Sequence, residues 1–336
     1  MSDKKELLKK VFNNEPAERI PVLFTHHYLG PDELNDGLNH PELLERNLAG
    51  ARAFKEEFDP DLVKIMTDGF FFLPYDFKSI RKVEDLEKIQ PLEEDNEWFA
   101  KSVELAKGYR EIYGDDILIF YNFFAPLTQL RSEVNRYAAK GNLHRDVVLE
   151  FLTQDAKAVA RALDVIAEDV IRLIKKVVSE GICDGIYLSV TNPNRKIPAD
   201  IYSLFIAPSE KKILAAANEL SEYNILHICG YEGNKNILSV YQDYDVKVVN
   251  WAVHAEQFGL KEGKKLFGGR AVIGGFDQTK DSVLYRGSKE EIEAYVEKLI
   301  EDVGKVGVVV GADCTVPADI SVERLNWARN KAKELS

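Results

Sequence analysis

The sequence predicts an α/β protein of the (β/α)8 TIM-barrel class, and two observations lead to that expectation. Eight short β-branched segments alternate with stretches of helical period between residues 20 and 311. The short segments are almost wholly apolar and lack polar alternation, which is typical of parallel strands buried on both faces. An open doubly wound sheet is the competing fold, although such sheets usually have fewer strands.

The expected strands and helices follow one another in chain order. The strands cover residues 20–24, 62–66, 117–121, 185–190, 225–228, 247–251, 271–274 and 307–310. Helical periodicity is clearest at residues 40–57 after the first strand, 155–178 before the fourth and 289–303 before the eighth.

Two segments fall outside this alternation. Residues 2–16 have helical period, and we expect residues 1–17 to form an N-terminal helical extension packed outside the barrel. The stretch from residue 124 to about residue 163 is too long for one crossover, so it predicts an extra helical insertion between strands three and four, over the top of the barrel. Length alone favours two domains, at about 150 residues each. Because no Pro- or Ser-rich linker interrupts the alternation, we interpret residues 1–336 as a single domain.

Composition excludes several classes of protein. With 45% apolar and 30% charged residues and no low-complexity tract, the chain is not a disordered one. Its net charge of −12 argues against a nucleic-acid or anionic membrane surface. The charged amino terminus lacks a secretory signal, and no apolar run reaches the roughly 18 residues that a spanning helix needs. Three cysteines in 336 residues are too few for a disulfide framework. We therefore expect a soluble, cytoplasmic protein with reduced thiols.

Chemically active side chains gather where the expected strands end. In a (β/α)8 barrel the active site lies at these carboxyl ends. His227 and Cys229 are two residues apart, so they can point to the same side as strand five opens into its loop. Cys314 ends strand eight and can converge with them across the mouth of the barrel. Two thiolates and one imidazole suit zinc, and three protein ligands leave a fourth position for substrate.

The alternative is that Cys229 and Cys314 are small buried hydrophobic residues and that His227 is a hydrogen-bonded core residue. Cys183 precedes strand four, at the floor of the barrel, and is interpreted as a packing residue.

Other strand ends supply weaker candidates. One of His26 and His27 is expected to reach the metal or substrate, while the other faces outward. Asp68 and Asp277 are candidates for a proton donor, a base or a partner of His227, with capping or turn carboxylates as the alternative. The candidates for binding the cofactor or lining its pocket are Tyr231, Trp251 and Asn192.

Four segments of the chain resemble the uroporphyrinogen decarboxylase superfamily, and the similarity extends over roughly residues 5 to 330. They are Arg19-Ile20-Pro21-Val22, residues 58–65, His227-Ile228-Cys229-Gly230 and Gly311-Ala312-Asp313-Cys314. The His-x-Cys…Cys pattern is similar to that of the zinc-dependent methyltransferase branch. The resemblance implies a (β/α)8 barrel whose zinc ligands are His227, Cys229 and Cys314.

The resemblance also implies a reaction and its partners. Enzymes of that branch move a methyl group between a corrinoid protein and a thiol, or from a methylated donor such as a methoxy or methylamine compound. The chain has no Asp-x-His-x-x-Gly segment to bind a corrinoid itself, so methylcobalamin or a related corrinoid would arrive on a partner protein. His26, His27, Asp68 and Asp277 are then the candidates for catalysis or substrate contact.

Two alternatives remain at this point. The first is a metal-free decarboxylase of porphyrin biosynthesis, and Asp68 falls near the catalytic acid of that branch. Residues 24–30, however, contain none of the arginines with which that branch holds substrate carboxylates. The second is a non-catalytic zinc-containing barrel that binds a corrinoid protein. The direction of transfer and the oligomeric state, a homodimer included, stay open.

Overall fold

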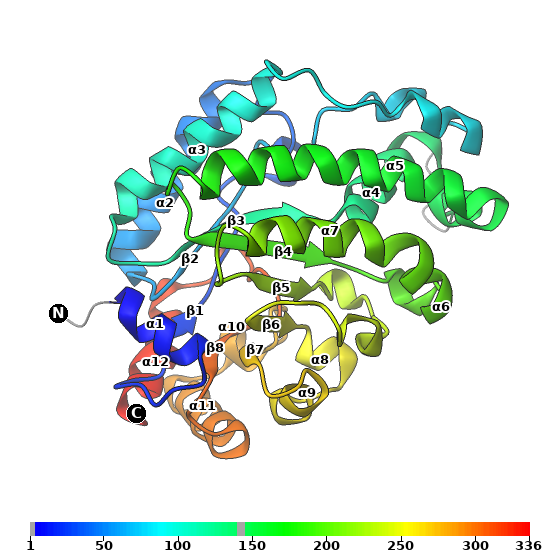
Figure 1. Ribbon diagram of the computed structural model, residues 1–336. Helices are drawn as coiled ribbons and strands as arrows, with labels where there is room; N and C mark the ends of the chain where they lie inside the picture. The colour runs from blue at the N-terminus through cyan, green and yellow to red at the C-terminus, as the bar shows by residue number, and fades with distance from the viewer. Residues whose placement is uncertain (1–3, 140–144) are drawn as a thin grey trace.

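The computed structural model describes residues 4–139 and 145–336. Its eight strands are all parallel and form one sheet that curls into a nearly closed barrel surrounded by helices (Figure 1). The predicted (β/α)8 fold is therefore confirmed. The strands are β1 (Val22–Leu23), β2 (Val63–Ile65), β3 (Ile119–Phe124), β4 (Gly185–Val190), β5 (Ile225–Ile228), β6 (Val248–Trp251), β7 (Ala271–Phe276) and β8 (Val308–Ala312).

The helices enclose the barrel and occupy most of the crossovers. They are α1 (Lys4–Phe12), α2 (Glu42–Phe58), α3 (Glu97–Tyr113), α4 (Pro126–Ala138), α5 (Val147–Val178), α6 (Ala199–Ile201), α7 (Ala207–Asn218), α8 (Val253–Glu256), α9 (Leu260–Leu266), α10 (Val283–Arg286), α11 (Lys289–Val303) and α12 (Val322–Glu334). No helix among the described residues is long and apolar enough to cross a membrane.

The predicted insertion between the third and fourth strands consists of α4 and the first part of α5, and its residues 140–144 lie outside the described residues. Asp155 interrupts α5 with non-helical backbone angles (φ −151°, ψ 87°). Its carboxylate accepts a hydrogen bond from the backbone N–H of Ala158 at 2.9 Å, as an N-cap does. A new helix therefore begins here, which is why the sequence pattern predicted a start at residue 155.

The expected regular alternation is wrong between β5 and β6, where the described chain has only two 3-10 segments, Tyr231–Gly233 and Leu238–Tyr241. The loop is rich in glycine and asparagine, and asparagine amides compete with helical backbone hydrogen bonds. Asn234 and Asn236 both donate from their side-chain amides to the carbonyl of Cys229, at 3.1 and 3.0 Å. Side chains rather than a helix therefore organise this loop.

Helix α1 lies across the amino ends of the strands and seals the floor of the barrel (Figure 1). Its apolar face packs on the inward side chains of the lowest barrel layer, and the Phe12 ring lies 6.0 Å from the Phe120 ring. The buried residues of that face are Leu8, Val11 and Phe12. The N-terminal extension is thus outside the barrel but closes one end of it.

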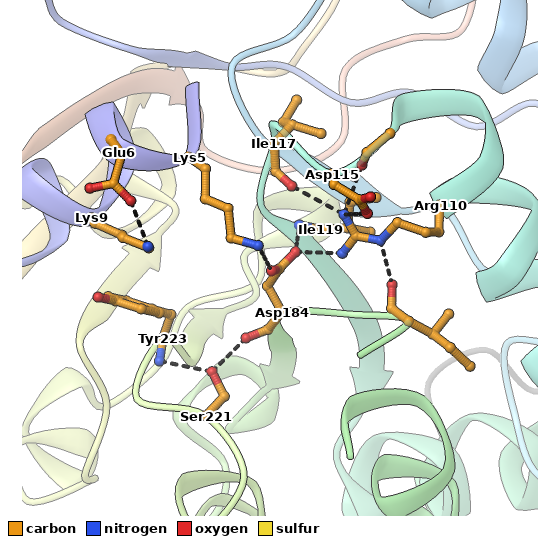
Figure 2. Close-up of polar contacts among 12 residues, drawn as sticks. Lys5, Glu6, Lys9, Arg110, Asp115, Ile117, Ile119, Asp184, Ser221 and Tyr223 are labelled. Atoms are coloured by element: carbon orange, nitrogen blue, oxygen red, sulfur yellow. Dashed lines mark hydrogen bonds and ion pairs between the residues drawn. The ribbon is translucent and has the colours of Figure 1, made fainter. Parts of the chain in front are cut away.

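Asp184, just before β4, fixes α1 on this floor. One carboxylate oxygen lies 2.7 Å from the ammonium of Lys5. The other accepts hydrogen bonds from Arg110 at 2.6 Å and from the backbone N–H of Ile119 at 2.9 Å. Figure 2 shows this single carboxylate at the meeting point of α1, α3 and β3.

Side-chain carboxylates join β1 to β2, because the described sheet has these two strands at its ends and no strand pair between them. At the amino end, Asp61 accepts hydrogen bonds from the backbone N–H of Val22 at 2.9 Å and from the two terminal guanidinium nitrogens of Arg19, at 2.8 and 2.5 Å. At the carboxyl end, Asp68 accepts the backbone N–H groups of Tyr28 and Leu29, at 2.7 and 3.2 Å. Two acids therefore replace the missing backbone ladder.

A fully buried carboxyl group, Glu210, lies on α7 among tyrosine hydroxyls. Tyr202 donates to it at 2.9 Å, Tyr244 donates to its other oxygen, and Tyr241 bonds the hydroxyl of Tyr202 at 3.0 Å. Burial raises the pKa of Glu210 to about 7, against the lowering effect of the hydroxyl hydrogen bonds. The folded protein therefore holds this proton at a pH at which the unfolded chain has released it.

Glu210→Gln is expected to become more stable relative to the wild type as the pH rises from 5 to 8. With a raised folded-state pKa, the stabilising contribution of Glu210 is complete below about pH 4.5 and is lost as the pH rises through about 7. The free energy of unfolding of the variant minus that of the wild type should rise by about 2.5 kcal/mol between pH 5 and 8, measured by urea denaturation at each pH. The exposed Glu219→Gln is the control, and a difference that does not change with pH would contradict the expectation.

Candidate metal centre

His227, Cys229 and Cys314 meet at the carboxyl-end mouth of the barrel. His227 lies on β5, Cys229 follows that strand, and Cys314 lies two residues beyond the end of β8. Their ligand atoms all lie within 4.8 Å of one another, and Cys314 Sγ is 3.6 Å from His227 Nε2. The structure thus brings together the three residues that the sequence selected as a metal site.

Asn250 on β6 sets the orientation of the His227 ring. Its amide oxygen contacts His227 Nδ1, and its amide nitrogen donates to the carbonyl of Ile273 at 2.8 Å. Since an amide oxygen only accepts, Nδ1 carries the proton, and Nε2 presents its lone pair towards Cys314. The same amide oxygen accepts the hydroxyl of Tyr187 at 2.7 Å, so Asn250 is itself held in place.

Asn250→Ala is expected to weaken metal binding about 10- to 100-fold, because the imidazole loses the partner that fixes its tautomer and angle. Competition with a chromogenic chelator measures the affinity. Asn122→Ala is the matched control, since Asn122 is another buried amide and bonds Ser189 at 3.2 Å. Equal affinities in the two variants would show that Asn250 does not orient the ligand.

The two thiols differ in acidity. Their mutual hydrogen bond lowers the pKa of Cys314 well below its ordinary value and raises that of Cys229. One thiol of the pair can therefore ionise more readily because the other donates a hydrogen bond to it. Cys183 lies at the floor of the barrel instead, and burial raises its pKa, as expected for an inert packing residue.

The backbone at Cys229 is held by the network of the loop after β5. Asn236, which donates to the Cys229 carbonyl, also bonds the buried carboxylate of Glu256 at 3.1 Å. Arg195 contacts the other oxygen of that carboxylate at 2.8 Å. The loops after β4, β5 and β6 are thereby joined around one metal-ligand candidate.

The two histidines after β1 point in different directions. The His26 ring lies edge-on to Phe54 of α2 at 5.0 Å, and burial lowers its pKa. His27 Nδ1 lies 2.8 Å from Asp68, and its side chain is 30% exposed. His27 and Asp68 therefore form a carboxylate–imidazole pair at the mouth, while His26 packs against α2.

The remaining candidates lie in varied surroundings. Asp277 accepts the backbone N–H of Thr279 at 2.8 Å, as a turn carboxylate does. Trp251 is fully buried and its ring lies 5.5 Å from that of Phe267, so it faces the helical layer and does not line the mouth. Asn192 is buried and donates to the Ile197 carbonyl at 2.8 Å. Tyr231, directly after the Cys229–Gly230 pair, is 58% exposed.

Two groups near the site were missed by sequence reasoning. Lys64 of β2 is only 8% exposed, and its ammonium lies 4.8 Å from the centre of the Tyr187 ring. A lysine in the middle of the apolar run 62–66 was the signal that could have identified it. The second group is an aromatic cluster of half-buried rings, which consists of Phe71, Phe72 and Phe124.

The fold and this donor set define a TIM-barrel protein with a candidate metal centre at the mouth of its barrel. Residues 69–335 match the uroporphyrinogen decarboxylase (URO-D) family, and the chain belongs to that family.

Curated relatives and solved structures add to this assignment. The chain is 26% identical over 262 residues to the methylcobamide:CoM methyltransferase MtbA of Methanosarcina mazei, covering 75% of this chain and 70% of that protein. It is 25% identical over 230 residues to MtbA of Methanosarcina acetivorans, covering 67% of this chain and 61% of that protein.

Among solved structures, a methyltransferase from Methanosarcina mazei superposes with a TM-score of 0.70 at 20% identity, covering 99% of this chain and 98% of that one. A B12-independent methionine synthase from Shewanella gives 0.61 at 14% identity, with 94% and 97% covered. At these identities the two structures are evidence for the fold alone.

Proposed function

We propose that this chain is a zinc-dependent methyltransferase that moves a methyl group between a corrinoid, carried by a partner protein, and a small molecule. The small molecule is a thiol acceptor or a methylated donor such as a methoxy or methylamine compound. The observation that carries the proposal is the convergence of His227, Cys229 and Cys314 at the open end of the barrel. The likeness to the Methanosarcina methylcobamide:CoM methyltransferases supports the reaction class.

The donor set fits zinc in both chemistry and spacing. Zinc prefers thiolate and imidazole ligands at about 2.3 and 2.0–2.1 Å, which places sulfur and nitrogen about 3.6 Å apart in a tetrahedral site. Cys314 Sγ and His227 Nε2 lie 3.6 Å apart. Among the described residues the cluster contains three ligands, so a fourth position remains for a substrate atom.

A zinc ion held there would lower the pKa of an incoming thiol and present it as a thiolate nucleophile. In the thiol-acceptor direction, a sulfur–carbon bond would form as the cobalt–carbon bond of the methylated corrinoid broke. The electron pair of the broken bond would stay with the corrinoid, and the thiol proton would be released.

The protein's own residues prepare the site for this transfer. Asn250 keeps the lone pair of His227 directed at the ligand cluster. Asn234 and Asn236 hold the backbone of Cys229. His27, oriented by Asp68, can exchange a proton with a leaving or entering group. We expect the exposed Tyr231 ring to contact the corrinoid or the small molecule.

The two alternative functions have less support. Porphyrin decarboxylation needs arginines that hold several substrate carboxylates, and residues 24–30 contain none. Arg195, in the loop after β4, is paired with Glu256. A purely structural zinc site is closed by four protein ligands, whereas the described cluster has three.

Methyl transfer from free methylcobalamin tests the proposal directly. The zinc-loaded protein is mixed with methylcobalamin and thiols, including the CoM named for the relatives, and loss of the methylcobalamin absorption is followed. The reverse assay supplies reduced cobalamin with methoxy or methylamine donors. We expect protein-dependent and zinc-dependent transfer in one direction. No transfer in either direction by zinc-loaded protein would overturn the proposal.

A further inference from the structure

His254 and Asp313 form a second carboxylate–imidazole pair at the carboxyl end of the barrel, and the proposed reaction does not yet use it. Asp313 directly precedes Cys314, and His254 lies on α8, in the loop after β6. His254 Nδ1 lies 2.9 Å from Asp313 Oδ2, and the backbone N–H of His254 donates to the same oxygen at 2.7 Å. One histidine thus contacts one carboxylate oxygen twice.

Among the described residues, His254 supplies every hydrogen bond of the Asp313 side chain. Asp313 is fully buried, and its other carboxylate oxygen, Oδ1, has no hydrogen-bond partner in the described part of the chain. A buried carboxylate is costly unless it is paired and hydrogen-bonded. His254 is therefore the residue that stabilises Asp313 in its buried position.

The second ring nitrogen of His254 is engaged as well. The hydroxyl of Tyr295 on α11 donates its single hydrogen to the Gly275 carbonyl at 2.7 Å, so its oxygen accepts a hydrogen bond from His254 Nε2 at 3.1 Å. Both ring nitrogens are thus occupied, whereas the polar contact of His27 is made through Nδ1 alone. His254 is therefore placed to hold its neighbours in position, and His27 remains the candidate for moving a proton.

The pair acts on the bend after β8 that carries Cys314. Among the described residues, no backbone–backbone hydrogen bond holds Cys314 itself, so its place depends on the residues on either side. The Asp313 backbone N–H donates to the Phe276 carbonyl of β7 at 2.8 Å. The Val316 backbone N–H donates to the Thr25 carbonyl, also at 2.8 Å. The Asp313 side chain adds a third attachment, to α8, one residue away from the thiol.

We propose that His254 is a positioning residue that holds Asp313 and thereby keeps the Cys314 thiol directed at the candidate metal cluster. The inference rests on the proposed metal centre and adds a residue outside its three ligands. His254 would act through the bend after β8, without touching the metal. Because outer partners of metal ligands typically contribute about 10- to 100-fold in affinity, the loss of this contact should be measurable.

Two substitutions of His254 separate its two ring contacts. The amide of His254→Asn can occupy the position of Nδ1 and keep the bond to Asp313. The longer His254→Gln places its amide at the position of Nε2, near Tyr295, and loses the side-chain bond to Asp313. We expect His254→Gln to weaken zinc binding at least about tenfold, measured by competition with a chromogenic chelator, and His254→Asn to weaken it less than about threefold.

Cobalt(II) substitution adds a spectroscopic signature of Cys314. The sulfur-to-cobalt charge-transfer absorption reports how well thiolates are bound to the metal. Per bound cobalt, this absorption should fall in His254→Gln, because the bond from Cys314 is weakened, and it should stay at the wild-type value in His254→Asn.

Asp61→Asn is the control for a general loss of stability. Asp61 is another buried carboxylate in an ion pair, but it lies at the amino end of the barrel. This variant should be less stable than the wild type and should bind zinc as the wild type does. His40→Gln controls for the loss of a histidine from an exposed carboxylate pair, and it should leave both stability and zinc affinity unchanged.

The outcomes distinguish this inference from the metal centre itself. If the wild-type protein fails to bind about one cobalt per chain, the metal centre is rejected, and the role of His254 falls with it. If cobalt binds but His254→Gln binds metal no more weakly than His254→Asn, the positioning role is overturned while the metal centre stands. An equal loss of affinity in Asp61→Asn would also overturn it, because the loss would then follow from stability alone.

Discussion

Cys314→Ser is expected to lose the metal and, with it, at least a hundredfold of methyl-transfer activity. The serine hydroxyl is a far poorer zinc ligand than a thiolate, and only His227 and Cys229 would remain of the described cluster. After dialysis the wild type should retain about one zinc per chain, and the variant less than about a tenth of that. Metal analysis by mass spectrometry, together with the methylcobalamin assay, measures both effects.

Cys183→Ala is the matched control for this experiment. Cys183 is also a free thiol, but it is buried at the amino end of β4, far from the mouth. Its removal should leave zinc content and activity unchanged, while circular dichroism checks that all proteins are folded. Retention of a full equivalent of zinc by Cys314→Ser would end the metal assignment.

Asp61→Asn is expected to destabilise the fold by about 3 kcal/mol. The carboxylate is almost fully buried and neutralises Arg19 with two short contacts, while it also satisfies the backbone N–H of Val22. The amide keeps an acceptor for that N–H but leaves the Arg19 charge without its partner. The loss should appear in urea denaturation, and metal content should be retained because Asp61 lies at the opposite end of the barrel from Cys229 and Cys314.

Asp59→Asn, two residues away, separates burial from charge. Asp59 also forms an ion pair, with Lys4 at 2.7 Å, but its side chain is 64% exposed. Exposed pairs contribute between 0 and about 1 kcal/mol. Comparable losses in the two variants would mean that Asp61 does not join β1 to β2 in the way described.

The strands could be predicted well from the sequence, because a strand that is buried on both faces consists almost wholly of apolar residues. Helix α11 begins and ends at the expected residues because its ends are encoded locally. The Ser288 side chain accepts from the Glu291 backbone, and Gly304 ends the helix with a φ of 84°. The loop between β5 and β6 could not be predicted in this way, because its conformation depends on amides that bond distant backbone groups.

The candidate metal cluster could be predicted because cysteine is a rare residue type and because two ligand candidates lie two residues apart at the end of a strand, which limits where their side chains can point. The rest of the site depends on which way each strand faces. Asn250 and Trp251 are adjacent on β6, and the sequence pattern favoured the tryptophan as a residue that lines the cofactor pocket. The register pairs Asn250 with His227, so the asparagine faces inward and the tryptophan faces the helices. Side-chain direction follows only once that pairing is known.

The helix across the barrel floor has a kinetic consequence. Leu8, Val11 and Phe12 cover the amino ends of the strands, so ligands of the candidate metal cluster would have to enter from the carboxyl end of the barrel. In the proposed reaction the corrinoid carrier and the small molecule would both approach from that end, and each would obstruct the passage of the other. Each product would also have to dissociate before the next substrate binds. High concentrations of the carrier should therefore slow the binding and release of the small molecule.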